Sequence, residues 1–224
     1  MSLTLIATPI GNSEDITLRA LSSLKNSNFI IGEELKTLRR RLSKWDIAFK
    51  EKTLLCLNEH TNTEELNELL DYCTKEDVCL VSDCGTPSFF DPGYDLVKLC
   101  RQKTVDIHSV PGVSSLTALM PFLPVKTQKF NVLGFPPQKD EDRKSFYKAH
   151  KKSEVPLFLM DTPYRLKKTL DELALHFPHS KIVLGVNLTC DNELVIQGTV
   201  LECIDNVKSL KKENFVLMIY PRGF

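Results

Sequence analysis

Residues 3–12 read LTLIATPIGN, an apolar run that ends in a tight turn containing Pro9 and Gly11. A short run with β-branched residues, bounded by such a turn, is typical of a buried strand. Similar runs follow at residues 29–32, 53–57, 78–82 and 105–110. Because segments with apolar residues at helical spacing separate these runs, we predict a mainly parallel sheet covered by helices, an α/β fold.

Two helix starts can be read from the residues that follow these strands. Ser13 precedes Glu14, and Thr63 precedes Glu64, before segments with one apolar face. Serine and threonine side chains commonly cap helix N-termini, and acidic residues favour the first turn. We therefore predict Ser13 and Thr63 as N-caps.

A second α/β domain is predicted after the stretch MPFLPVKTQKF, residues 120–130. Its two prolines interrupt the helix that Ser114 begins, and no new periodicity starts before Phe130. We place the domains at residues 1–125 and 126–224. In the second domain, KIVLGVNL, ELVIQGTV and NFVLMIY predict strands with a single short helix at 201–210 among them, which indicates a mixed, partly antiparallel sheet.

Charge and cysteine content limit the classes of function. The 29 basic residues are balanced by 29 acidic ones, so any contact with nucleic acid requires a local basic patch. The seven cysteines form no CxxC pair, which disfavours a disulfide framework and a zinc site. With neither a signal peptide nor an apolar segment of membrane-spanning length evident, we expect a cytoplasmic protein without a metal.

Small polar residues stand beside proline or glycine after four of the predicted strands, in TPIGN, DCGTPSFFDPG, PGVSS and MDTPYR. Ligands of open α/β sheets bind where strands end and helices begin. The dinucleotide fingerprint, the phosphate-binding P-loop and the GxSxG nucleophile elbow are all absent from the sequence. The loops therefore predict a ligand site of another kind, and ordinary turn chemistry is the alternative for any one of them.

Taken in order, TPIGN, VSDCGTPSFFDPGYDLV and VPGVSSLTAL, followed by GFPP and FLMDTPYRL, resemble the tetrapyrrole methylase superfamily of S-adenosylmethionine-dependent methyltransferases. The nearest branch methylates a cytidine ribose 2'-hydroxyl of small-subunit ribosomal RNA. This resemblance implies two α/β domains with S-adenosylmethionine in the cleft between them, and a homodimer. The chain ends at Phe224, whereas many members of that branch continue into a small C-terminal extension.

The resemblance also implies which residues contact the cofactor. Each of them closes a predicted strand or begins the next helix, and together they can offer backbone groups, a polar partner and apolar walls. These residues are Pro9, Asp83, Gly85, Thr86, Ser114, Ser115, Met160 (or its neighbour Leu159) and Leu188.

The predicted acceptor side departs from the family pattern. Glu33 matches the glutamate of the family's Ala-Glu-Asp-Thr-Arg, and His60 stands in Asn-Glu-His-Thr where the family has His-Asp-His-Asn. A ribose hydroxyl is a poor nucleophile that a base activates by ~10²- to 10⁴-fold, so we predict Glu33 and His60 as catalytic residues. Around Leu188, three charged residues of the family's Arg-Glu-Leu-Thr-Lys are missing.

Two basic groups are candidates for contact with RNA phosphates. Arg39 and Arg40 lie in KTLRRRLSK, and Lys139 and Arg143 lie in a charged segment of the second domain. We therefore predict 2'-O-ribose methylation of ribosomal RNA, with RNA or the small subunit as partner. Three alternatives stay open: a solvated basic surface, methylation of a tetrapyrrole-like or other small molecule, and S-adenosylmethionine binding without turnover.

Overall fold

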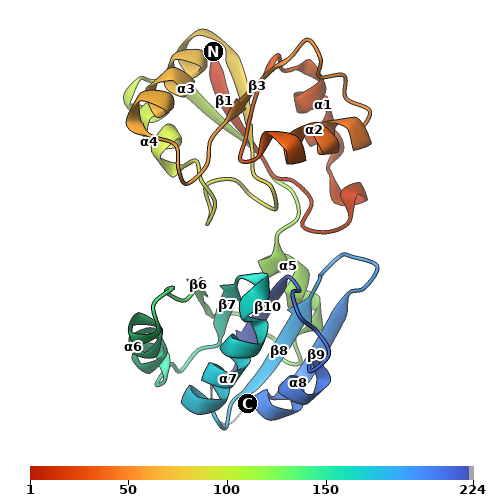
Figure 1. The fold of residues 1–224 in the computed structure, drawn as a ribbon, viewed down its shortest axis with the longest axis vertical. Helices are drawn as coiled ribbons and strands as arrows, with labels where there is room; N and C mark the ends of the chain where they lie inside the picture. Colours follow the sequence, from red (N-terminus) through yellow and green to blue (C-terminus); the bar gives the residue numbers. More distant parts are fainter. Residues whose placement is uncertain (222–224) are drawn as a thin grey trace. The chain divides into compact units, whose positions relative to one another are not determined.

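The computed structural model describes residues 1–221 and contains two compact α/β units, Met1–Ser114 and the chain from Ser115 onward (Figure 1). The predicted boundary at residue 125 lies later in the chain. Helix α5 (Ser115–Leu119) belongs to the second unit because Leu119 is buried and packs against Gly185 of that unit's sheet. The last three residues of the predicted second domain, 222–224, lie outside the described residues.

The sheet of the first unit contains five strands in the order β3-β2-β4-β1-β5, all parallel. This confirms the predicted parallel arrangement. The strands are β1 (Ser2–Ile6), β2 (Phe29–Gly32), β3 (Thr53–Cys56), β4 (Asp77–Val81) and β5 (Asp106–Val110). The main helices are α1 (Leu18–Asn26), α2 (Leu35–Lys44), α3 (Thr63–Lys75) and α4 (Tyr94–Gln102).

Helices cover both faces of this sheet. Side chains alternate along a strand, so Ile30 packs with the α1 and α2 side chains while its neighbour Ile31 packs with those of α3 and α4. A strand with two covered faces is apolar at successive positions, which explains the continuous apolar runs of the sequence.

The helix starts differ slightly from those predicted. Asn12 caps a short 3₁₀ turn, η1 (Ser13–Asp15), and Thr17 caps α1 by accepting a hydrogen bond from the Ala20 amide at 3.1 Å. In α3 the N-cap is Asn62, and the Glu65 carboxylate accepts a hydrogen bond from the Asn62 amide, which completes a capping box. Both predicted N-caps are therefore wrong. The cap of α1 is a threonine four residues after Ser13, and the cap of α3 is the asparagine before Thr63, a residue type that caps helices as well as threonine does.

The sheet of the second unit is mixed, as predicted, with the order β6-β7-β10-β8-β9. Strand β10 (Phe215–Ile219) runs antiparallel to β7 (Leu157–Asp161) and β8 (Lys181–Val186), and β9 (Leu194–Thr199) runs antiparallel to β8. Strand β6 (Asn131–Gly134) is parallel to β7. Besides α5, the helical elements are η2 (Met120–Phe122), α6 (Asp140–His150), η3 (Pro163–Arg165), α7 (Leu166–His176) and α8 (Val200–Asn206).

Candidate functional site

The turn after β1 and the loop after β4 are joined at one edge of the first sheet. The Thr8 amide donates to the Gly85 carbonyl at 2.8 Å, and the Gly85 amide donates to the Thr8 carbonyl at 3.1 Å. Gly85 has φ +81°, a conformation that strains other residues. The structure thus brings together two predicted cofactor loops, with Pro9 buried beside the bridge and Thr86 exposed after it.

Polar side chains hold together this joint, the contact between the turn after β1 and the loop after β4. Thr8 is only 1% exposed, and its hydroxyl donates to the Ser82 carbonyl at 3.0 Å. The same hydroxyl accepts a hydrogen bond from Arg41 Nη1 at 3.0 Å. The Ser82 hydroxyl donates to the Gly85 carbonyl at 3.1 Å. Sequence reasoning did not assign Thr8, Ser82 or Arg41 to the site, although the first two lie within the motifs that indicated it.

Glu33 lies at the end of β2 and is coupled to the loop after β4. The Asp83 amide donates to Glu33 Oε1 at 2.9 Å. Burial raises the pKa of Glu33 to about 7, against the smaller, lowering effect of that hydrogen bond. Burial also raises the pKa of Asp83, which Arg41 partly offsets. Glu33 is therefore a carboxyl group that changes protonation near neutral pH.

A cavity of about 750 Å³ opens beside these groups, between the loops that follow β2, β3 and β4. It brings together three predicted site residues, Glu33, His60 and Asp83. His60 is exposed, with Nε2 3.6 Å from Glu59. Burial also raises the pKa of Asp91 to about 6. The carboxylates that line this cavity are Glu33, Glu34, Glu59, Asp83, Asp91 and Asp95.

In the second unit, Ser115 and Met160 lie together. The Ser115 hydroxyl is 3.8 Å from the Met160 sulfur, and Met160, at the end of β7, is 9% exposed. Leu188 is buried against Gly185 of β8. Ser114, the remaining predicted cofactor residue, is half-buried and closes the first unit.

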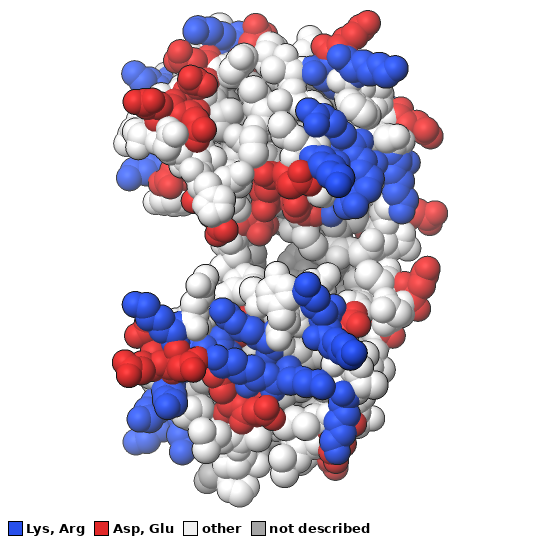
Figure 2. Space-filling model, in the orientation of Figure 1, with Lys and Arg blue, Asp and Glu red and all other residues white. Residues whose placement is uncertain are grey.

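Three of the four predicted RNA contacts are accessible. Arg39 and Arg40 are exposed on α2, and Lys139 is exposed immediately before α6. Figure 2 shows basic side chains gathered over α2 and, beside them, a group of acidic ones. This arrangement leaves a local basic surface on a chain without net charge.

Arg143 is the exception. The prediction that it contacts RNA is wrong, because its side chain is buried. Its side chain is fully buried, with Nη2 2.9 Å from Asp161 Oδ2 and Nε within 3.0 Å of both Glu172 oxygens. The same Nη2 also donates to Thr169 at 3.2 Å. Because Arg143 follows the apolar side of α6 with Tyr147, one helical turn later, it points into the core.

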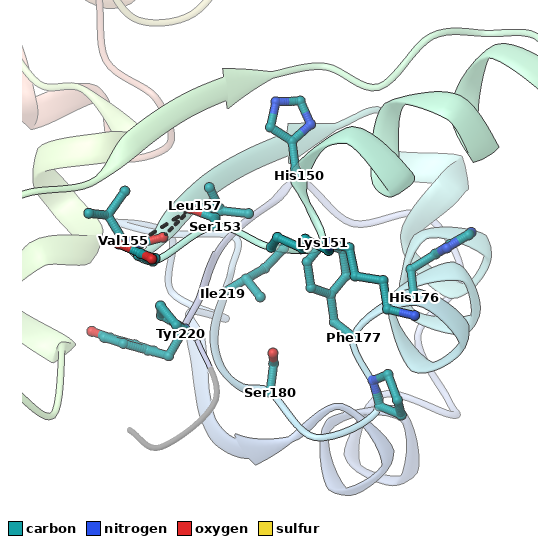
Figure 3. Close-up of a pocket in the computed structure, with 14 residues that line it drawn as sticks. His150, Lys151, Ser153, Val155, Leu157, His176, Phe177, Ser180, Ile219 and Tyr220 are labelled. Atoms are coloured by element: carbon teal, nitrogen blue, oxygen red, sulfur yellow. Dashed lines mark hydrogen bonds between the residues drawn. The ribbon is translucent and has the colours of Figure 1, made fainter.

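A cavity of about 760 Å³ lies in the second unit, and Figure 3 shows side chains that line it. Leu157, at the start of β7, lines it together with His176, Phe177 and Ser180. Met160 lies near the other end of the same strand. The residues that line this cavity include none of the predicted site residues.

Among residues 1–221, no three His, Cys, Asp or Glu side chains are grouped so that they could hold a metal ion. All seven cysteines are free, and burial raises the pKa of the Cys84 thiol to about 11.

Among residues 1–221, no helix has the length and apolar character needed to cross a bilayer.

Comparison with known proteins shows to which family the chain is similar. The model of the Tetrapyrrole (Corrin/Porphyrin) Methylases matches residues 2–203. The chain belongs to this family. Two similar relatives of this tetrapyrrole methylase are named Ribosomal RNA small subunit methyltransferase I. The protein of Hydrogenobaculum sp. is 32% identical over 93% of this chain and 90% of its own, and that of Halalkalibacterium halodurans is 31% identical over 99% and 76%.

Solved structures share the fold of this tetrapyrrole methylase at low sequence identity. Diphthine synthase matches with a TM-score of 0.73 and 14% identity, covering 98% of this chain and 90% of its own. Uroporphyrin-III C-methyltransferase from Thermus thermophilus, in complex with S-adenosylhomocysteine, matches with a TM-score of 0.66 and 17% identity, covering 98% and 96%. At these identities the likeness establishes the two-unit α/β fold.

Proposed function

We propose that this tetrapyrrole methylase transfers a methyl group from S-adenosylmethionine to small-subunit ribosomal RNA. One observation carries the proposal: the relatives named Ribosomal RNA small subunit methyltransferase I are 31–32% identical over 93–99% of the chain. The solved neighbour in complex with S-adenosylhomocysteine, the product that such a cofactor leaves behind, supports the choice of cofactor. The protein is a methyltransferase that uses S-adenosylmethionine.

The residues proposed to hold the cofactor suit its chemistry. Gly85, which has no side chain and adopts φ +81°, allows the two proposed cofactor loops to join through backbone hydrogen bonds with Thr8. Asp83 is a half-buried carboxylate that can pair with a hydroxyl or an ammonium group. In the second unit, Met160 and Leu188 offer apolar surface. The full proposed set is Pro9, Asp83, Gly85, Thr86, Ser114, Ser115, Met160 and Leu188.

S-adenosylmethionine supplies an activated methyl group on a good leaving group, so the protein mainly has to align the acceptor oxygen with the methyl carbon. The carbon–oxygen bond forms as the carbon–sulfur bond breaks, and the hydroxyl proton passes to a base. Glu33 suits this role because its pKa of about 7 allows it to be deprotonated at neutral pH and still basic. His60, in the same cavity, is the second proposed catalytic residue.

The proposed acceptor is a polyanion, and the exposed cations of the chain are proposed to contact it. Arg39 and Arg40 on α2 and Lys139 before α6 are accessible to phosphates. A cytoplasmic location follows from the proposed substrate, and the 2'-hydroxyl of a cytidine ribose is the proposed acceptor group. We also propose a homodimer, on the resemblance to the family.

Transfer of a tritiated methyl group tests the proposal. The purified protein is incubated with labelled S-adenosylmethionine and, separately, with small ribosomal subunits, bare ribosomal RNA and a metabolite extract. We expect label in the RNA or the subunits, and nuclease digestion should release 2'-O-methylcytidine. Label confined to the metabolite extract would replace RNA by a small-molecule acceptor. Cofactor binding without transfer to any of the three would indicate a binding protein.

A further inference from the structure

Arg41 differs from the other arginines of α2. Arg39 and Arg40 are exposed, whereas Arg41 is half-buried on the side of the helix that faces the sheet edge. Its Nη1 donates to the Thr8 hydroxyl at 3.0 Å, and Thr8 in turn is bonded to Ser82. The guanidinium is therefore held at the joint between the two proposed cofactor loops.

This guanidinium has few partners for a half-buried cation. Among residues 1–221, it forms no ion pair within 4.0 Å, and the bond to Thr8 is its one side-chain hydrogen bond. A guanidinium carries five N–H donors. Removing a cation from water is costly unless it is paired, so the remaining donors favour an anionic partner that binds from outside.

The surroundings hold this charge in place without neutralising it by contact. Burial lowers the pKa of Arg41, while the charges of Asp83 and Glu33 favour its cationic form from a distance. Arginine recognises carboxylates and phosphates through two parallel hydrogen bonds, which lysine cannot match. Arg41 thus has the charge, the free donors and the position to bind an oxyanion at the proposed site.

We propose that Arg41 binds an oxyanion of one of the two reactants. The inference rests on the proposed function and extends it, because it names a binding residue that the basic surface of Arg39 and Arg40 does not include. Two sources of the oxyanion fit: the carboxylate of the methionine portion of S-adenosylmethionine, and a phosphate of the RNA acceptor. The two sources predict different results for an Arg41→Met variant.

The first arm measures cofactor binding by calorimetry, with S-adenosylmethionine and with its decarboxylated analogue. If Arg41 binds the carboxylate, Arg41→Met weakens binding of S-adenosylmethionine by about tenfold or more and leaves the analogue unchanged. The second arm measures the KM for ribosomal RNA. If Arg41 binds a phosphate, this KM rises by about tenfold while the affinity for S-adenosylmethionine stays the same. Either result supports the proposal.

Two results overturn the proposal. The first is an Arg41→Met variant whose affinity for S-adenosylmethionine and whose KM for ribosomal RNA are both unchanged. The second is an equal loss of affinity for S-adenosylmethionine and its analogue, which would indicate a structural role. Arg101→Met makes the same substitution at an exposed arginine of α4, outside the proposed site, and this control should bind like the wild type. If Arg41→Met does not fold, Arg41→Lys keeps the charge, loses the two-bond geometry, and should show the same selective loss to a smaller degree. Wild-type protein that binds the cofactor but methylates no RNA would reject the proposed function alone, since the calorimetric arm remains valid.

Discussion

At the scale of single residues, Glu33 is the group whose environment is most informative. It stands at the end of a buried strand, accepts the Asp83 amide, and lines a cavity rich in carboxylates. Burial and like charges both disfavour its ionised form, which brings its pKa to about 7. Two predictions follow from this single value, one for catalysis and one for stability.

If Glu33 is the base, methyl transfer needs its ionised form. The rate of the wild type should then rise with pH through about 7, and Glu33→Gln should lower kcat by ~10²- to 10⁴-fold and abolish this rise. Single-turnover transfer of labelled methyl groups across pH 5.5–8.5 measures both. Glu68→Gln on α3, an exposed glutamate outside the cavity, is the control. A Glu33→Gln variant with the wild-type pH profile would exclude Glu33 as the base.

The same pKa makes stability depend on pH. Folding raises the pKa of Glu33 from 4.5 to about 7, so the folded protein holds this proton more tightly than the unfolded chain does. The contribution of Glu33 to the free energy of unfolding therefore falls as pH rises through this window. Glu33→Gln stays neutral, so its stability relative to the wild type should be greater at pH 8 than at pH 5. Urea unfolding at both pH values tests this, and an equal difference at both would contradict it.

At the scale of elements, Arg143 connects α6 to β7 and α7. Its partners Asp161 and Glu172 come from the other two elements, and both pairs lie in or at the edge of the core. Asp161 directly follows Met160 and accepts the Thr162 amide at 2.8 Å. The ion-pair network thus fixes the end of β7, where a proposed cofactor residue lies.

Removing the cation from this network should destabilise the second unit. Arg143→Met leaves two carboxylates without their buried partner, and breaking such a pair costs about 3–5 kcal/mol. Urea unfolding measures the loss. Lys144→Met, at the exposed neighbouring position, should change stability by no more than about 0.5 kcal/mol. Equal stabilities for the two variants would show that the network contributes little.

At the scale of the whole molecule, balanced net charge means that RNA affinity has to come from local surfaces. Reversing Arg39 and Arg40 together to glutamate should raise the KM for ribosomal RNA by about tenfold or more at low salt and reduce the salt dependence of binding. Cofactor affinity should not change. Lys98→Glu combined with Arg101→Glu on α4 makes the same change in charge elsewhere and serves as the control. Equal effects of both pairs would indicate that only total charge matters.

Much of the fold could be predicted because its signals are local. The apolar runs predicted the five strands of the first sheet and β8, β9 and β10 of the second, together with the parallel character of the first sheet and the mixed character of the second. The division near Ser115 was less accessible, because the prolines after α5 mark a break in the helix and not a change of packing partner. The candidate site was partly predicted, since Glu33, His60 and Asp83 line one cavity. Thr8 and Ser82 were missed because they read as ordinary strand-end residues, and Arg41 was missed because its neighbours read as a basic surface.

The sequence by itself determined the alternation of strands and helices, the order of the loops and the family, because periodicity and motifs are properties of neighbouring residues. Only the tertiary structure decided which basic side chains are available. Arg39, Arg40 and Arg41 are consecutive, yet only Arg41 reaches Thr8, and Arg143 turns inward from a charged segment to meet Asp161. Burial and pairing depend on partners far along the chain, and those partners are brought together only when the sheets form.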